Sequence, residues 1–255
     1  MKVALVTAGS GGIGKAIVEK LLENNYYVAV TSRNISKLYA AFSHIKSTHL
    51  LYIETNLLDT ASCKNAIEDT IERFGQLNLL VNNAGAAVLN QPFEHGSLKD
   101  FQDVMNLNVQ SVFFMTQYAI PYLIDTRGTI INFSSVLAHR PAIGLGPYCA
   151  SKAAVEMLTQ TSALELAPKN IRVMCIAPTA IQTEFHVNAG MTKEQADEYY
   201  KNCSKTHPLG RVGQVSDITE LVVFLADNSK AGFMTGSVIH VDGGRLLTSA
   251  SAFKN

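Results

Sequence analysis

The feature of this sequence that most constrains its fold is an alternation of short apolar runs with longer segments of helical period. Seven runs rich in aliphatic and β-branched residues predict strands, at residues 3–6, 27–31, 50–54, 78–82, 129–133, 171–176 and 238–241. Runs without polar alternation are typical of parallel strands that helices cover on both faces. The main helical segments between them are residues 12–23, 98–123 and 148–166. The pattern predicts a single-domain α/β Rossmann fold over residues 1–255, with a doubly wound sheet of seven parallel strands.

The composition excludes several classes of function. The 21 basic side chains balance 21 acidic ones, so no net charge favours nucleic acid or an anionic membrane as partner. The four cysteines are far apart and form no CxxC pair, which favours reduced thiols over disulfides or a metal site. No apolar run reaches the roughly 18 residues of a membrane span, and no signal-like region precedes the first strand. We therefore expect a cytoplasmic protein without a metal, a nucleic-acid partner or a membrane.

One long interruption lies between the sixth and seventh predicted strands. It covers residues 185–209 and holds its own helix candidate at residues 193–203. In open α/β sheets, ligands bind at the carboxyl ends of the strands, where this segment must lie. We expect a substrate lid at about residues 184–210.

A glycine-rich turn, TAGSGGIG at residues 7–14, joins the first strand to the first helix. Free backbone N–H groups and the positive end of a helix suit such a turn to a phosphate. A P-loop pattern also fits, except that Ala16 stands where a hydroxyl must hold magnesium.

Two dinucleotide patterns fit the same turn. GxGxxG is met by Gly9, Gly11 and Gly14, whereas TGxxxGxG is met by Thr7, Gly12 and Gly14 with Ala8 at its first glycine. A tight turn that binds no ligand is the remaining alternative.

The end of the second strand indicates which dinucleotide would bind. NAD-binding units carry an acid there, whereas an arginine accommodates the 2′-phosphate of NADP. This strand ends Thr31-Ser32-Arg33 without an acid. A planar guanidinium matches phosphate, so the sequence favours NADP(H). A solvated surface arginine is the alternative.

Tyr148 and Lys152 have the spacing of a catalytic pair. At positions i and i+4 of a predicted helix they share one face. A phenol with a pKa of about 10 is a poor proton carrier at neutral pH. A neighbouring ammonium favours the phenolate, so we expect Lys152 to lower the pKa of Tyr148. A YxxxK pair arises easily by chance, and its context must decide.

That context resembles the short-chain dehydrogenase/reductase family over about residues 1–245. After the glycine turn come Asn82-Asn83-Ala84-Gly85, identical to the family's NNAG, and an asparagine in a helix, Asn108. Ser135 precedes Tyr148 by the family's spacing of 13 residues. Residues 178–183 resemble the PGxxxT segment, and Val-Asp-Gly-Gly at 241–244 resembles the closing strand.

The resemblance implies a catalytic tetrad of Asn108, Ser135, Tyr148 and Lys152. Tyr148 would exchange a proton with the substrate oxygen, and Ser135 would hold that oxygen. Lys152 would hold the nicotinamide ribose, and Asn108 would anchor a water that relays protons. The implied cofactor-binding residues are Gly9, Ser10, Gly11, Gly12, Ile13, Gly14, Ser32, Arg33, Asn56, Leu57, Asn83, Ala84, Gly85, Tyr148, Lys152, Pro178, Ile181 and Thr183.

Three positions depart from the family pattern. Ala8 replaces the first glycine of the turn, so the loop is expected to sit slightly differently. Asn56 replaces an aspartate near the adenine amino group and keeps only a carbonyl acceptor. Thr179 replaces the glycine after Pro178, beside the nicotinamide. All three concern cofactor affinity more than chemistry.

The expected activity is reduction of a carbonyl compound or oxidation of the matching secondary alcohol by a small-molecule oxidoreductase. Expected pocket walls at residues 86–89, 136–141, 143–145 and the lid at 185–209 are mostly small or apolar, with His139, Arg140 and His186 as polar exceptions. Arg140 is either an anion ligand or a surface residue. The chain looks most like 3-oxoacyl-reductases and general carbonyl reductases. A non-catalytic NADP-sensing protein would be expected to lack Tyr148 or Lys152. A lyase or epimerase would need more chain than residues 245–255 after the last strand.

The resemblance also implies a homotetramer or homodimer. The family pairs its two long helices, here residues 98–123 and 148–166, across a two-fold axis. A partner chain would then cover apolar positions such as Val112, Met115, Val155 and Met157, and an ordinary core within the chain is the alternative for the same residues.

Overall fold

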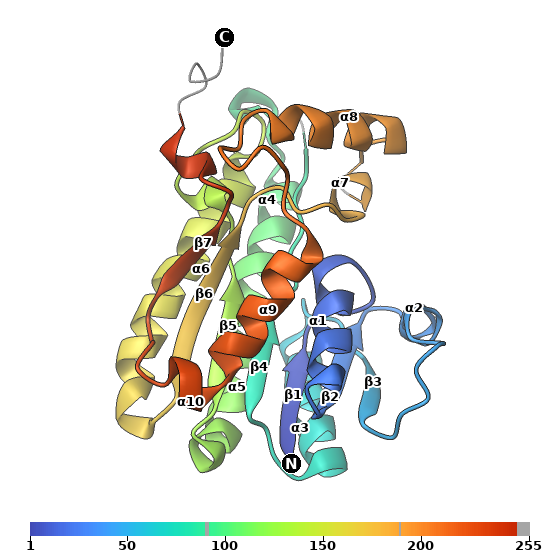
Figure 1. Cartoon of the computed structure of the whole chain (residues 1–255), viewed down its shortest axis with the longest axis vertical. Helices are drawn as coiled ribbons and strands as arrows, with labels where there is room; N and C mark the ends of the chain where they lie inside the picture. The colour runs from blue at the N-terminus through green and yellow to red at the C-terminus, as the bar shows by residue number, and fades with distance from the viewer. Residues whose placement is uncertain (90–91, 189, 249–255) are drawn as a thin grey trace.

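A computed structural model describes residues 1–89, 92–188 and 190–248 of the chain. Its single sheet is parallel throughout and has the strand order β3-β2-β1-β4-β5-β6-β7 (Figure 1). The strands are β1 (Lys2–Val6), β2 (Tyr26–Ser32), β3 (Leu50–Glu54), β4 (Leu79–Asn82), β5 (Thr129–Phe133), β6 (Arg172–Pro178) and β7 (Val238–Val241). The predicted Rossmann fold in a single domain is confirmed, and the predicted strands are each within two residues of the observed ends. Residue 189 of the expected lid and residues 249–255 lie outside the described residues.

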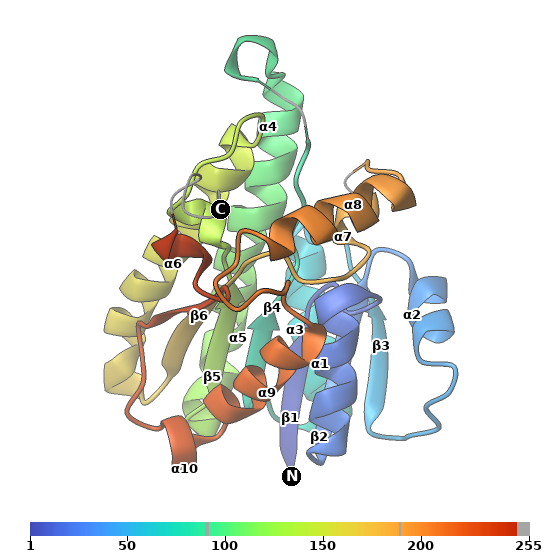
Figure 2. The same ribbon diagram turned by 45° about the horizontal axis from the view of Figure 1, so that its top comes forward.

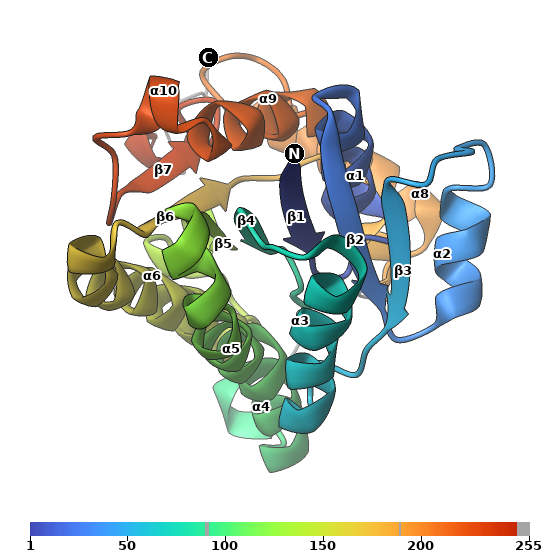
Figure 3. The same ribbon diagram turned by 90° about the horizontal axis from the view of Figure 1, so that it is seen from below.

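Helices cover both faces of the sheet, as Figure 3 shows from below. One face carries α1 (Gly12–Glu23), α2 (Ile35–Ala41) and α9 (Val215–Ala226), and the other carries α3 (Thr60–Phe74), α5 (Ser111–Thr126) and α6 (Gly146–Leu166). Successive strand residues alternate between the two cores: Ala4 and Val6 pack with α1, whereas Val3 and Leu5 pack with α3 and α5. Two buried faces explain why the strands read as continuous apolar runs.

The predicted helix over residues 98–123 is interrupted. The structure has α4 (Leu98–Met105), then a π-helical turn at Asn106–Gln110, then α5, which continues to Thr126. A π-turn adds one residue per turn and often lies at a functional site. Sequence periodicity does not reveal such a turn, because the apolar positions on either side keep a helical spacing. The turn contains Asn108.

Space around the β1–α1 turn distinguishes its glycines. A Cβ on Gly9 would lie 2.3 Å from Val30 Cγ2, and one on Gly14 would lie 2.5 Å from Asn83 Nδ2. Gly12 has φ +53°, whereas a Cβ on Gly11 would meet nothing within 4 Å. The pattern TGxxxGxG therefore describes the steric needs of this turn better than GxGxxG does. Ala8, at the first glycine of that pattern, adopts φ +53°, a left-handed conformation that favours glycine.

The strand order places a topological switch point between β1 and β4. The chain leaves β1 for α1 on one face and leaves β4 for α4 and α5 on the other, and such a point opens a crevice at the carboxyl ends of the strands. Two helices of the expected lid, α7 (Phe185–Asn188) and α8 (Lys193–Ser204), lie beyond that edge, on the side of α1 (Figures 1 and 2).

The remaining short elements connect these layers. They are α10 (Asn228–Ala231) and the 3₁₀ turns η1 (Phe93–His95), η3 (Val136–Ala138), η4 (Ala167–Lys169) and η5 (Arg245–Leu247). In the described part of the chain, the helices lack the combination of length and apolar character that a bilayer span requires.

Candidate active site

Thr7 joins the two sides of the switch point. Its Oγ1 accepts hydrogen bonds from the backbone N–H groups of Asn83 (3.0 Å) and Ala84 (3.1 Å) and lies 3.3 Å from the carbonyl of Val81, to which it donates. The side-chain amide of Asn83 donates in return to the carbonyl of Thr7 at 3.0 Å. The end of β1 and the Asn-Asn-Ala-Gly segment after β4 are thereby held in one position. The glycine-turn motif contains Thr7, but no role in the site was predicted for this residue from the sequence.

The amino end of α1 is open. Its N-cap residue, Gly11, makes no side-chain capping bond, and the first turn carries no acidic residue. The first N–H groups of a helix without such partners, together with the helix dipole, favour an anion. This end is therefore suited to the pyrophosphate of a dinucleotide.

Hydroxyl groups and a cation lie next to that end. Ser32, buried at the end of β2, donates from Oγ to Ser10 Oγ at 3.4 Å, which brings the glycine turn and β2 together. Arg33 follows and is exposed, with its guanidinium available to solvent. Two hydroxyls and a guanidinium form a suitable set of donors for a phosphate on the adenosine ribose.

Asn56 and Leu57 follow β3 at the adenine side. The Oδ1 of Asn56 accepts from the N–H of Leu58 at 3.2 Å, within its own turn. Leu57 is buried against the core. One lone pair of the Asn56 oxygen is thus used locally, and its other remains available to a further donor.

Asn108 links the segment after β4 to the helix that carries the tyrosine. It is fully buried, and its Oδ1 accepts from the N–H of Ala86 at 2.9 Å. Its Nδ2 donates to the carbonyl of Ala86 at 2.9 Å and to Ser151 Oγ at 3.0 Å. Ser151 in turn donates to the carbonyl of Tyr148 at 2.7 Å. The sequence did not indicate Ser151, because a serine between Tyr148 and Lys152 has no motif of its own.

Lys152 is buried in the middle of these groups. Its side chain is 3% exposed, and its ammonium donates to the carbonyl of Phe133 at 2.9 Å. A Cβ on Gly85 would come within 3.0 Å of Nζ, so only glycine leaves the ammonium this space. Burial lowers the pKa of Lys152 to about 8, because the charged form loses its hydration.

Tyr148 lies beside Ser135 and under the ammonium of Lys152. The Nζ of Lys152 is 5.5 Å from the centroid of the Tyr148 ring. Burial raises the pKa of Tyr148 to about 12, and a hydrogen bond with Ser135 acts in the opposite direction. The expected lowering by Lys152 is therefore not the dominant effect in this arrangement. With such a pKa, the phenol keeps its proton at neutral pH and is placed to donate it.

The segment after β6 is tied to the lid. The hydroxyl of Tyr200, on α8, donates to the carbonyl of Thr183 at 2.9 Å and accepts from the N–H of Thr183 at 3.3 Å. Thr179 Oγ1 lies 2.8 Å from Nε2 of His207, which is buried. Pro178 ends β6, and Ile181 is buried and forms a bridge with Gly213. Tyr200 and His207 belong to no motif, so the sequence did not predict their contacts with this segment.

Two contacts describe the substrate side. The ring of Phe185, on α7, lies 6.3 Å from the ring of Tyr148, which places α7 next to the tyrosine. The guanidinium of Arg140 donates to the carbonyls of Thr248 (2.5 Å) and Arg245 (3.5 Å). These bonds favour a structural role for Arg140, since its donors hold the segment after β7.

The buried charge of Lys152 predicts a pH-dependent cost in stability. Its pKa is about 8 in the folded chain against an ordinary value of 10.5, so the unfolded chain binds more protons between these values. Stability therefore rises with pH across that window, and below it the cost is roughly 3 kcal/mol. We expect Lys152→Met to raise the free energy of unfolding at pH 7 and to raise it much less at pH 10.5.

Urea unfolding of the wild type and of Lys152→Met at both pH values measures this difference. Exposed Lys64, on α3, provides the matched control Lys64→Met, which should show no such pH dependence. A gain for Lys152→Met that is the same at both pH values would contradict a buried charge at this position.

Comparisons with known proteins agree with this geometry. A family model described as short chain dehydrogenase matches residues 2–195. A protein of Staphylococcus aureus named 3-oxoacyl-[acyl-carrier-protein] reductase FabG is 37% identical over 250 residues, which cover 96% of this chain and 98% of the relative.

Solved structures show the same likeness. A short-chain dehydrogenase/reductase of unknown function from Caenorhabditis elegans, solved with cofactor, has a TM-score of 0.92 at 27% identity, covering 98% of this chain and 97% of that one. A 3-ketoacyl-(acyl-carrier-protein) reductase from Brucella melitensis, complexed with NADH, has a TM-score of 0.86 at 28% identity and covers 96% and 98% of the two chains. Because the family model and these relatives match nearly the whole chain, this protein belongs to the short-chain dehydrogenase/reductase family of oxidoreductases.

Proposed function

We propose that this protein is an NADP(H)-dependent oxidoreductase that reduces a carbonyl compound, or oxidises the matching secondary alcohol, with Tyr148 as general acid and base. The observation that carries the proposal is the arrangement around that phenol. Ser135 is hydrogen-bonded to it, and the buried ammonium of Lys152 lies 5.5 Å from its ring centroid. All three side chains lie at the carboxyl edge of the sheet, beside the switch point.

The described residues fit a dinucleotide at this edge. The open end of α1 offers N–H groups to the pyrophosphate, and the tight approach of Gly9 and Gly14 leaves the turn no room for side chains there. When bound, the dinucleotide supplies the hydride in reduction and accepts it in oxidation. We assign its binding to the residues of the glycine turn, the ends of β2, β3 and β4, and the segment after β6: Gly9, Ser10, Gly11, Gly12, Ile13, Gly14, Ser32, Arg33, Asn56, Leu57, Asn83, Ala84, Gly85, Pro178, Ile181 and Thr183.

Each of the four proposed catalytic residues has its own role. Ser135 holds the carbonyl oxygen through its hydroxyl, and Tyr148 donates its phenolic proton to that oxygen. Lys152 binds the nicotinamide ribose and stabilises the phenolate that remains, because its ammonium lies against the ring. Asn108 fixes the turn of α6 that carries Tyr148 through Ser151, and its Oδ1 keeps a second lone pair for a relay water. α7 and α8 cover the substrate, with Phe185 next to the phenol.

The second candidate for the substrate is a 3-oxoacyl thioester, and one observation favours it. The Staphylococcus aureus relative carries that activity in its name. An apolar carbonyl compound in general remains our main proposal, because Phe185 is the aromatic neighbour of Tyr148 and Arg140 is occupied by backbone carbonyls. A non-catalytic NADP-sensing role is not supported, since Tyr148, Lys152 and Ser135 are all present and together.

The proposed dimer or tetramer depends on exposed apolar side chains. Val112, Met115 and Val155 are buried in the chain's own core, so for these three the alternative of an ordinary core holds and no partner is needed to cover them. Met157 on α6 is 61% exposed. Leu164, farther along α6, and Phe113, on α5, are also exposed. Apolar groups in such positions favour a partner surface.

We expect light scattering of the purified chain at micromolar concentration to give the mass of at least a dimer. Met157→Lys should shift the chain towards monomer, because it places a charge on the proposed interface. Tyr39→Lys, on exposed α2, is the control that should leave the mass unchanged. A monomer mass for the wild type would overturn the proposal.

Cofactor preference tests the role of Arg33. The Brucella relative holds NADH in its crystal structure, so the likeness alone does not choose between the two dinucleotides. Because Arg33 and Ser32 end β2 without an acid, we expect tighter binding of NADPH than of NADH. Arg33→Ala should narrow that difference by roughly tenfold or more, as expected for a lost charge-assisted pair of about 1.5–3 kcal/mol.

Fluorescence titration with both dinucleotides measures the preference. Arg73→Ala, which removes another exposed arginine at the end of α3, should leave it unchanged. Equal affinity of the wild type for the two dinucleotides would refute the assignment.

The mechanism is tested at the phenol. Tyr148→Phe keeps the ring and removes the transferable proton, so turnover should fall by about 10²–10⁴-fold with little change in NADPH affinity. Ser135→Ala should lower turnover without affecting NADPH binding, whereas Lys152→Ala should weaken both. Tyr39→Phe is the matched control and should be indistinguishable from wild type.

Single-turnover hydride transfer to a panel of 3-oxoacyl thioesters, diketones, ketosteroids and sugar ketones provides the readout. Near wild-type transfer by Tyr148→Phe on a substrate that the wild type reduces would remove the phenol from the mechanism.

A further inference from the structure

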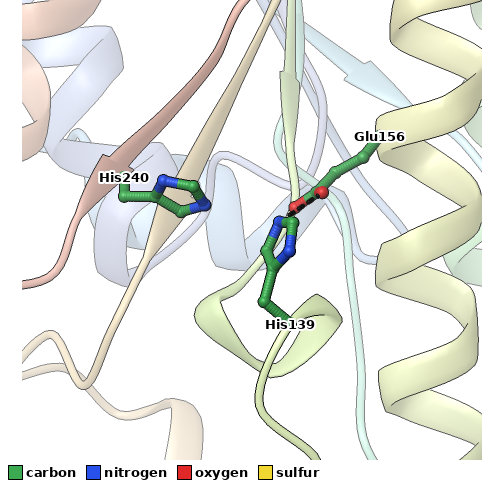
Figure 4. A group of neighbouring side chains, drawn as sticks. All are labelled: His139, Glu156 and His240. Atoms are coloured by element: carbon green, nitrogen blue, oxygen red, sulfur yellow. Dashed lines mark ion pairs between the residues drawn. The ribbon is translucent and has the colours of Figure 1, made fainter. Parts of the chain in front are cut away.

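His139, Glu156 and His240 meet at one point although they are far apart in the sequence (Figure 4). His139 follows η3, just after the strand end that carries Ser135; Glu156 lies on α6, one turn beyond Lys152; and His240 lies on β7. One nitrogen or oxygen atom from each side chain lies within 4.8 Å of the others. Three potential metal ligands thus come from three separate elements of the fold.

Glu156 is the buried member of this cluster. Only 6% of the residue is exposed, and its Oε2 lies 2.7 Å from Nε2 of His139. Its other oxygen, Oε1, accepts a hydrogen bond from Ser134 Oγ at 2.7 Å. Ser134 Oγ also lies 3.1 Å from the carbonyl of Lys152, so its single proton lies between two acceptors on α6 and the serine is fixed to that helix. A carboxylate held by one oxygen presents the other in a defined direction, as the ligands of metal sites commonly do.

The two histidines complete a set with an open side. Both are exposed, and their rings lie 5.0 Å apart between centroids at an interplanar angle of 78°. Figure 4 shows the imidazole of His240 extending from β7 towards His139, and Glu156 reaching the same place from α6. The exposed histidines let an ion enter from solvent, and the buried carboxylate of Glu156 can hold it there.

We propose that His139, Glu156 and His240 form a binding site for a divalent transition cation of the zinc type. Two imidazole nitrogens and one carboxylate oxygen are a donor set that zinc uses in proteins, with a fourth position left for water. Calcium and magnesium prefer oxygen ligands and would not select two imidazoles.

The geometry needs only small adjustments to hold such an ion. Metal–ligand distances of about 2.0–2.1 Å place tetrahedral ligand atoms about 3.3 Å apart. The His139 and Glu156 atoms must therefore separate by about 0.6 Å from their present 2.7 Å contact. The ligand atom of His240 lies within 4.8 Å of the other two, so it has to approach them by at most about 1.5 Å.

A cation at this point joins three parts of the proposed active-site framework. It connects the segment after Ser135 to α6, which carries Tyr148 and Lys152, and connects both to the edge strand β7. The ion binds the folded chain, which assembles the three ligands, so it stabilises that chain against unfolding. The site can be tested apart from the proposed reaction, because none of the three residues is among the proposed catalytic or cofactor-binding residues and the test measures metal binding.

Metal titration of the full chain without a polyhistidine tag tests the proposal. Calorimetry with Zn²⁺ and absorption spectroscopy with Co²⁺ should give one tight site per chain, and Zn²⁺ should raise the melting temperature. His240→Gln should weaken both metals by at least the roughly 10–100-fold typical of losing an orienting partner, and should remove the thermal shift. Its side chain is exposed, so the variant should fold, and circular dichroism verifies that it does.

The matched control is His95→Gln, which removes another exposed histidine beside a carboxylate, Glu94. This variant should bind Zn²⁺ and Co²⁺ as the wild type does. His139→Gln should weaken binding as His240→Gln does, since both supply a nitrogen. Wild-type affinity in His240→Gln, or an equal loss in His95→Gln, would show adventitious binding to surface histidines and overturn the proposal.

Discussion

The hydroxyl of Thr7 binds the end of β1 to the backbone after β4 across the switch point, and the position of the site depends on this contact. A parallel sheet with helices on both faces must separate its two halves at one place, and its ligand crevice forms there. Gly14 lets α1 lie close to the side chain of Asn83, at a distance that a Cβ would forbid. The amide of Asn83 can therefore donate to the carbonyl of Thr7. These contacts add to the pairing of β1 with β4 and continue it beyond the strand ends, where the glycine turn and the Asn-Asn-Ala-Gly segment begin.

Burial, more than charge pairing, sets the proton affinities at the proposed site. Tyr148 has its pKa raised and Lys152 has its pKa lowered, both because the charged form of each group loses hydration. Burial favours the neutral form of both groups, so the pKa of the phenol moves further above neutral pH and the pKa of the ammonium moves closer to it. A phenol that holds its proton beside a lysine of reduced proton affinity is suited to donation in the reductive direction. The same desolvation makes the lysine costly to the fold, and the local structure contributes the carbonyl of Phe133 in partial compensation.

The first half of α6 organises the chemistry along one face of a helix. Tyr148, Lys152 and Glu156 follow at intervals of one turn, so each faces the same side as the one before it. Adjacent serines at the end of β5 serve two different neighbours, since Ser135 binds the phenol and Ser134 binds Glu156. The proposed catalytic group and the proposed cation site are thus built on the same two elements, and the order of side chains on α6 keeps them apart.

Much of this protein could be predicted from its sequence, and the rest has an identifiable physical origin. The seven strands, the covering helices and the glycine turn were predictable because strand burial and helix periodicity are local properties that repeat along the chain. The tetrad residues were recognisable because each belongs to an ordered motif. The π-turn around Asn108 was not, since one additional residue in a helical turn leaves the apolar pattern intact. Whether Val112, Met115 and Val155 lie in the core or at an interface could not be decided from the sequence, because an apolar residue has the same sequence signature in both places. The contacts of Tyr200, His207 and Ser134, and the His139–Glu156–His240 cluster, join segments that are far apart in the sequence.

The sequence by itself determined the elements and their chemistry. The tertiary structure decided which side chains meet and how far burial shifts their proton affinity, because distance and desolvation exist only once the chain is folded.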